Sequence, residues 1–152
     1  AMTALVLGVG NPMRRDDGVA HAVLAEVVAR APGTDVREVY GDPASLVAVW
    51  AGVDVVVLVD AVTGGGEPGD VLRFERRDER WDVVPPAAPL SSHGWSLADA
   101  LELAGVLDRV PARLVLVGVV AGDLGTGDRL SAPVAAAVGP AAALVLAEVA
   151  TA

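Results

Sequence analysis

Short apolar segments alternate with segments of helical periodicity along this chain, and the alternation predicts the fold. Five segments predict strands: residues 4–9, 36–40, 53–60, 71–75 and 113–119. The segment 71–75 is more polar than the others and is expected at an edge of the sheet. Four others predict helices: residues 16–30, 43–50, 96–107 and 131–149. This order favours a three-layer α/β fold in which helices sandwich a mostly parallel central sheet of about five strands, built by a single domain over residues 1–152.

The boundaries of these elements carry their own signals. Asp16 and Asp42 precede helical segments and are expected to be their N-caps. Residues 76–90 are charged and then proline-rich, which predicts a loop. A glycine and a proline at 139–140 predict an interruption of the last helix.

Composition and charge narrow the function classes. The chain carries a net charge of −9 and only 3% aromatic residues, which argues against nucleic-acid binding and permits a cation or a basic partner. It has no cysteine, which excludes disulfides, thiolate metal sites and a cysteine nucleophile. No uninterrupted apolar run approaches the ~20 residues of a membrane span, and the start of the chain lacks the pattern of a signal peptide. We therefore expect a cytoplasmic protein without a membrane span.

The stretch VLGVGNPMRRDDGVA, residues 6–20, raises the first question of chemistry. Gly8 and Gly10 follow a strand as in a dinucleotide-binding loop, but Met13 stands where the third glycine belongs, and no Gly-Lys-Ser/Thr occurs. A phosphate-binding loop is therefore disfavoured. The alternative is that the strand end delivers Asn11 and Asp17 to the edge of the sheet where open α/β folds bind ligands.

Two further polar positions are expected near Asp17. Asp60 closes the valine-rich third strand at the same carboxyl edge, and His93 precedes a predicted helix. Two carboxylates and one imidazole suit a borderline divalent ion such as Ni²⁺, Zn²⁺ or Co²⁺. His21, four residues after Asp17, could share a helix face with it but is expected at the edge of the buried stripe. Purely structural roles are the alternatives: Asp17 could interact with the N-terminal end of a helix, and Asp60 could bond backbone N–H groups in a turn.

The ordered motifs of this chain resemble one family, the endopeptidases that mature the large subunit of nickel–iron hydrogenases. Four segments carry the resemblance: GVGNPxxxDDG at 8–18, VDA at 59–61, SHG at 92–94 and GxxLS at 127–131. It implies Asp17, Asp60 and His93 as metal-contacting positions, in an enzyme that removes a C-terminal extension from the large-subunit precursor. Many members carry Glu where this chain has Asp17.

The resemblance implies that the substrate supplies the nickel. Whether the resting protein binds another divalent metal is left open. No G-x-S-x-G elbow accompanies the serines beside His93, so water is the expected attacker, with Asp17 or Asp60 as general base. Asn11 is expected to orient the loop or the substrate. We expect a monomer whose partner is the hydrogenase precursor. The main alternative is a non-catalytic nickel or large-subunit docking factor; a different metal-dependent hydrolase and a nucleotide-binding protein rank lower.

Overall fold

The computed structural model describes residues 2–39, 42–83 and 97–152. Its helices and strands follow one another in this order: β1 (Ala4–Val9), the 3₁₀ helix η1 (Arg15–Gly18), α1 (Val19–Arg30), β2 (Val36–Val39), α2 (Pro43–Trp50), β3 (Val55–Val62), β4 (Val71–Arg77), β5 (Arg80–Trp81), α3 (Leu97–Val106), β6 (Arg113–Val120) and α4 (Ala132–Ala150).

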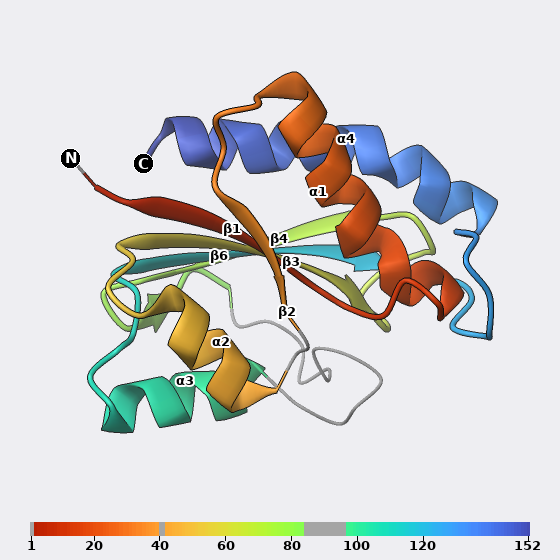
Figure 1. Ribbon diagram of the computed structural model, residues 1–152. Coiled ribbons are helices and arrows are strands. Elements are labelled where there is room, and N and C mark those ends of the chain that lie inside the picture. The colour runs from red at the N-terminus through yellow and green to blue at the C-terminus, as the bar shows by residue number, and fades with distance from the viewer. Residues whose placement is uncertain (1, 40–41, 84–96) are drawn as a thin grey trace.

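These elements form three layers around one mixed sheet (Figure 1). The strand order is β2-β1-β3-β6-β4-β5. The first four strands in that order are parallel, and β4 and β5 extend the sheet in antiparallel fashion. Helices α1 and α4 cover one face and α2 and α3 cover the other. The predicted α/β sandwich with a mostly parallel sheet is confirmed, with a sixth strand added.

Strand alternation explains how both faces of the sheet are filled. In β3, Val57 and Val59 pack with α1 and α4, whereas Val56 and Leu58 pack with α2 and α3. Both faces are buried, so the strand is apolar at nearly every position, as expected for a parallel strand between helices. Asp60 is the exception in β3, and it too is fully buried.

Several predicted boundaries were wrong. Asp16 does not cap α1: it lies in η1, and α1 begins only at Val19 with Gly18 as its N-cap. The predicted loop over 76–90 contains the end of β4 and all of β5, because β4 pairs with the open side of β6 and β5 pairs with β4. Residues 84–90 of that predicted loop lie outside the described residues. The predicted interruption of α4 does not occur, since the helix runs through Pro140. Packing of its buried face against α1 and the sheet outweighs the lost hydrogen bond. The cap at Asp42 is confirmed: its carboxylate accepts the N–H of Ser45 at 2.9 Å.

An ion-pair network ties α4 to the amino end of β6. Arg113 is buried and bonds the carboxylates of Glu75 on β4 and Glu148 on α4, and Arg73 bonds the same two carboxylates. The hydrogen bond from Arg113, joined by those from Arg77 and Arg73, lowers the pKa of Glu75 to about 2. Each charge in the network therefore has a partner of opposite sign.

Helix α4 is the one described helix that is long and apolar enough to cross a membrane by length and composition. Within α4, Gly139, Pro140 and Glu148 interrupt the apolar positions, so the helix contains no uninterrupted apolar run of that length. Its buried residues nevertheless pack in the core cluster with α1 and the sheet, which is the arrangement of a core helix.

Candidate functional site

The candidate site lies where the order of the parallel strands reverses. From β1 the chain passes through α1 to β2 on one side, and then through α2, over the other face, to β3 on the opposite side of β1. Open α/β sheets bind ligands at the carboxyl ends of the strands at such a point. Asp17 follows β1 here, and Asp60 lies near the end of β3.

The β1–η1 loop folds back onto itself around Asp17. One carboxylate oxygen of Asp17 accepts the backbone N–H of Asn11 at 2.9 Å. Gly10 makes this closure possible, because its φ is +145° and a Cβ atom there would lie 2.0 Å from the carbonyl oxygen of Asp17. Asn11 also fixes the turn by accepting the N–H of Met13 on its side-chain oxygen at 2.9 Å.

This geometry answers the question of the glycine-rich loop. A phosphate-binding loop offers free backbone N–H groups to an anion. Here the N–H of Asn11 is already used by the carboxylate of Asp17. The loop therefore presents a carboxylate to the sheet edge, and the glycines serve its close folding.

Asp60 is a buried carboxyl group for which the described residues provide no hydrogen-bond partner of good geometry. Its exposed fraction is 0%, and within residues 2–39, 42–83 and 97–152 both of its carboxylate oxygens lack a partner. Along β3, pairing with β1 reaches only as far as Gly8 and Val59, so Asp60 is the first residue beyond that ladder. An unpartnered buried carboxyl is costly, and such groups gather at functional sites.

The two carboxylates influence each other electrostatically. Burial raises the pKa of Asp60 well above its ordinary value, the negative charge of Asp17 raises it further, and the nearby N–H of Ala61 offsets this only in part. Proximity of two like charges in a buried setting leaves a local excess of negative charge. Buried oxygens without donors and with excess negative charge fit a cation, so the donor set suits a divalent metal.

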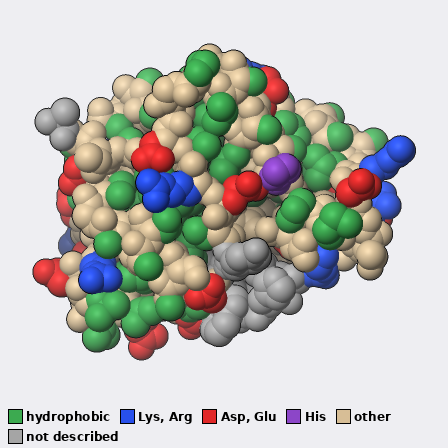
Figure 2. All heavy atoms as spheres, viewed as in Figure 1, with side chains coloured by type: hydrophobic (Ala, Val, Ile, Leu, Met, Phe, Trp, Pro, Cys, Tyr) green, Lys and Arg blue, Asp and Glu red, His purple; other side chains and the backbone are tan. Residues whose placement is uncertain are grey.

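The remaining predicted ligand, His93, lies outside the described residues, so the structure brings together only Asp17 and Asp60 of the predicted set. Within the part of the chain that is described, no group of three His, Cys, Asp or Glu side chains could hold a metal ion. The other histidine, His21, is half-exposed and bonds Glu38 at 2.7 Å. Figure 2 shows this histidine at the surface beside an acidic side chain. His21 therefore does not join the site.

Sequence reasoning missed the role of Asp16. Its carboxylate is fully buried and accepts four hydrogen bonds from the chain between β6 and α4: from the N–H groups of Gly122, Asp123 and Ser131 and from the hydroxyl of Ser131. Burial alone would raise the pKa of Asp16, but these hydrogen bonds outweigh it and lower the pKa below its ordinary value. The motif at residues 127–131, which ends in Ser131, was recognised in the sequence. Its role as a partner of Asp16 could not be assigned without the fold.

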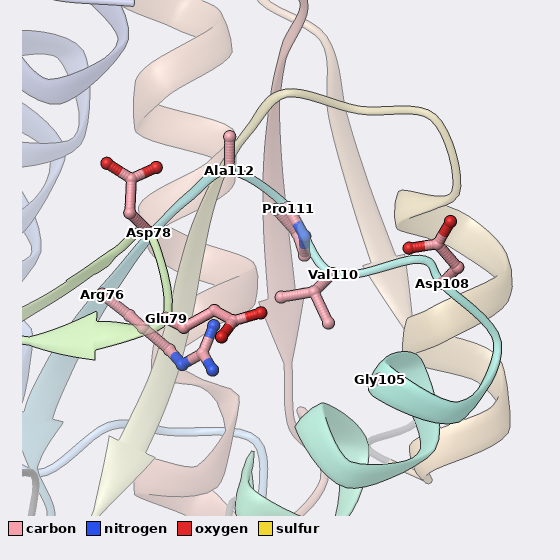
Figure 3. Close-up of a pocket in the computed structure, with 8 residues that line it drawn as sticks. All are labelled: Arg76, Asp78, Glu79, Gly105, Asp108, Val110, Pro111 and Ala112. Atoms are coloured by element: carbon pink, nitrogen blue, oxygen red, sulfur yellow. The ribbon is translucent and has the colours of Figure 1, made fainter.

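A second hollow lies at the other end of the sheet and is separate from this site. It has a volume of about 410 Å³ and lies between the β4–β5 turn and the link from α3 to β6. Figure 3 shows Arg76 and Glu79 reaching into it near Val110 and Pro111. Its acidic residues do not converge into a potential metal-binding group.

Comparison with known proteins decides the family. A family model described as HycI, hydrogenase maturation protease, matches residues 41–148. This chain belongs to the hydrogenase maturation protease family. The matched range includes Asp60 and His93 and begins after Asp17. By family, this hydrogenase maturation protease is a peptidase.

Solved structures resemble this hydrogenase maturation protease over nearly its whole length. The hydrogenase maturating endopeptidase HybD from E. coli is 26% identical, with 96% of this chain and 91% of that chain covered at a TM-score of 0.79. The nickel–iron hydrogenase maturation protease HybD from Thermococcus kodakarensis is 25% identical, with 95% and 97% covered at a TM-score of 0.71. An endopeptidase from E. coli, at 24% identity, shares the fold with a TM-score of 0.78 over 97% and 91% of the two chains. A search of curated proteins gave no match.

Proposed function

We propose that this hydrogenase maturation protease removes the C-terminal extension from the nickel-loaded precursor of a nickel–iron hydrogenase large subunit. The observation that carries the proposal is Asp60, a fully buried carboxyl group whose two oxygens have no hydrogen-bond partner among the described residues and which lies beside a second carboxylate. The names of HybD from E. coli and from Thermococcus kodakarensis support the reaction class.

In this proposal, Asp17 and Asp60 contact the nickel that the substrate brings. Asp17 keeps one oxygen on the N–H of Asn11, which holds the carboxylate in place and leaves its other oxygen for the metal. His93 is the third contact. The substrate's nickel supplies the positive charge that the two carboxylates recognise, so a precursor without nickel is not engaged.

Peptide-bond cleavage then falls to water and a carboxylate base. The chain has no cysteine and no nucleophile-elbow motif, and the carboxyl group of Asp60 has a pKa raised by burial and by Asp17. A carboxyl group whose pKa is raised is a stronger base than an ordinary carboxylate, and it can take a proton from water and return it to the leaving amine. We therefore assign Asp60 as the general base as well as a nickel contact, and Asp17 as the other metal-contacting carboxylate. The reaction would take place in the cytoplasm, with the protease acting as a monomer.

The test mixes the purified protein with nickel-loaded, unprocessed large subunit and with the same subunit lacking nickel. Mass spectrometry then reports whether a C-terminal peptide is lost. We expect cleavage only with nickel, and a loss of at least about 10²-fold in rate for Asp60→Asn and for His93→Ala. His21→Ala is the matched control, because it removes the other histidine, which bonds only Glu38 among the described residues.

Two outcomes would contradict the proposal. Binding of the nickel-loaded subunit without loss of a peptide would make the protein a docking factor instead of a protease. Equal cleavage of nickel-free and nickel-loaded precursors would retain the peptidase and remove nickel recognition.

A further inference from the structure

The two adjacent aspartates of the motif have different surroundings. Asp17 uses one oxygen on a single backbone N–H of its own loop. Asp16, one residue earlier, accepts four hydrogen bonds at 2.7–2.8 Å from a segment more than a hundred residues away in sequence. One carboxylate is therefore fully used within the protein, whereas the other has one oxygen that bonds none of the described residues.

The partners of Asp16 join the three elements that border the site. Gly122 and Asp123 lie in the loop that follows β6, and Ser131 is the N-cap of α4. The hydroxyl of Ser131 makes no bond to its own helix and bonds the carboxylate of Asp16 instead. The N-terminal end of a helix favours negative charge, so α4 adds to the hold on this carboxylate.

Backbone contacts reinforce the same junction. The N–H of Asp16 bonds the carbonyl of Asp123, that of Arg15 bonds the carbonyl of Gly127, and that of Gly127 bonds the carbonyl of Met13, each at 2.9 Å. The side chain of Arg15 also lies 2.8 Å from the carboxylate of Asp123. We call these contacts, together with the four hydrogen bonds of the Asp16 carboxylate, the Asp16 clamp.

The clamp fixes Asp17 by continuity of the chain. Asp17 follows Asp16 directly, and its own N–H bonds the carbonyl of Arg14 within the same turn. Asp60 sits on the central strand β3, paired with β6, so its backbone is fixed independently. Two neighbouring carboxylates repel each other, and a loop without the clamp would let Asp17 move away from Asp60.

Resting on the proposed function, we propose that Asp16 is the positioning residue of the protease, which holds Asp17 beside Asp60 by clamping η1 to the chain between β6 and α4. Asp16 itself touches no substrate. Misplacement of a reacting group by about 1 Å can reduce a rate by about 10²-fold, so the effect of the clamp is expected in the rate of the chemical step.

The first test is the variant Asp16→Asn, which keeps the shape of the side chain. One oxygen of Asp16 serves three donors and the other serves the N–H of Ser131. The amide group of Asn would face at least one of these N–H donors with a donor of its own. We expect kcat on the nickel-loaded precursor to fall by about 10²-fold, with KM changed by less than about 3-fold. KM should hold because a protein substrate contacts an enzyme over a much wider surface than two carboxylates. Ser131→Ala, which removes one donor, should lower kcat by a smaller factor.

Glu75→Gln is the matched control, because it weakens the ion-pair network at the other end of β6 without touching the clamp. All variants are assayed at a temperature where circular dichroism shows them folded. If the role of Asp16 is purely structural, Asp16→Asn and Glu75→Gln should lose the same share of kcat when their melting temperatures are lowered to a similar extent. That result would overturn the proposal.

A second measurement does not depend on activity. Hydrogen exchange of the Asn11 amide, followed by NMR, reports whether the carboxylate of Asp17 stays on its N–H. We expect at least about 10-fold faster exchange of this amide in Asp16→Asn than in Glu75→Gln. Unchanged exchange would overturn the clamp even if the enzyme slows. If the wild-type protein fails to cleave the precursor, the proposed function has failed, and the exchange result still decides whether Asp16 positions Asp17.

Discussion

Replacement of Asp60 by Asn should make the protein more stable at neutral pH while it abolishes cleavage. In the wild-type protein, folding moves this carboxyl group from water into a buried place beside the charge of Asp17, where the described part of the chain offers it no hydrogen-bond partner. Asn has the same shape and cannot ionise. It carries the same burden of unpartnered polar atoms as the protonated acid, so the comparison isolates the cost of the charge.

The sign and the size of the effect follow from linkage. The pKa of Asp60 is raised in the folded state, so folding takes up a proton and becomes less favourable as pH rises above the ordinary value of 3.8. Below that value the group is protonated in both states and costs nothing. Each pH unit above 3.8 adds at most about 1.36 kcal/mol until the folded pKa is reached. At pH 7 the ceiling is therefore about 4 kcal/mol, and we expect Asp60→Asn to be more stable than the wild-type protein by up to this amount.

The assay is urea unfolding of both proteins at pH 4.5, 6.0 and 7.5 in the presence of a chelator, followed by tryptophan fluorescence. Trp50 is fully buried and should report the loss of the core. The difference in the free energy of unfolding should widen with pH, with similar m-values. Asp128→Asn, at an exposed position, controls for the loss of one negative charge. A gain that is equal at all three pH values, or a destabilised Asp60→Asn at pH 7.5, would refute the reasoning.

Three other predictions follow from contacts described above. The pKa of Glu75 is lowered to about 2, so the stability that this carboxylate contributes is complete above its ordinary pKa of 4.5 and is lost as pH falls toward 2. Glu75→Gln should therefore lower the free energy of unfolding at pH 7 by about 3 kcal/mol. Urea titrations at several pH values should also show that stability falls less steeply with acid in this variant than in the wild-type protein. Gly10→Ala should destabilise by about 1–3 kcal/mol, because the φ of +145° excludes an L side chain and the new Cβ would meet the Asp17 carbonyl; wild-type stability in thermal unfolding would contradict this. His21→Ala should change stability by less than about 1 kcal/mol and leave cleavage unchanged, since its pair with Glu38 is exposed; a large loss of activity would place His21 in the site after all.

The parts of the fold that were predictable are those set by local pattern. Strands that are buried on both faces of a sheet are apolar at nearly every position, and this pattern is visible in the sequences of β1, β3 and β6. The first turn of a helix has free N–H groups that need an acceptor, and Asp42 stands in the sequence where such a cap belongs. The continuity of α4 through Pro140 was not predictable from the chain alone. It is decided by what the opposite face of the helix packs against.

The sequence could place Asp17 and Asp60 at one edge of the sheet, but it could not give the arrangement around Asp16 and Asp17. The metal-contacting roles of Asp17, Asp60 and His93 stay predictions. Two adjacent aspartates look alike in the sequence, and a cap was the simplest role for Asp16. What separates them is the loop that begins at Gly122, more than a hundred residues later, which supplies donors to Asp16 and none to Asp17 among the described residues. Only the contact in three dimensions between the loop that follows β1 and the loop that follows β6 assigns the two roles.

The use of the Asn11 N–H by Asp17 has a consequence for the design of inhibitors. A phosphate, sulfate or carboxylate compound would have to displace the carboxylate of Asp17 from the Asn11 N–H. Because Asp17 is part of the same loop, its effective concentration there is high, and such compounds should bind poorly. Compounds that present a metal ion or a positively charged group would find two carboxylates with no competing internal cation among the described residues. The chemistry of a selective inhibitor is therefore that of a cation, at a site whose glycine-rich loop would have suggested an anion.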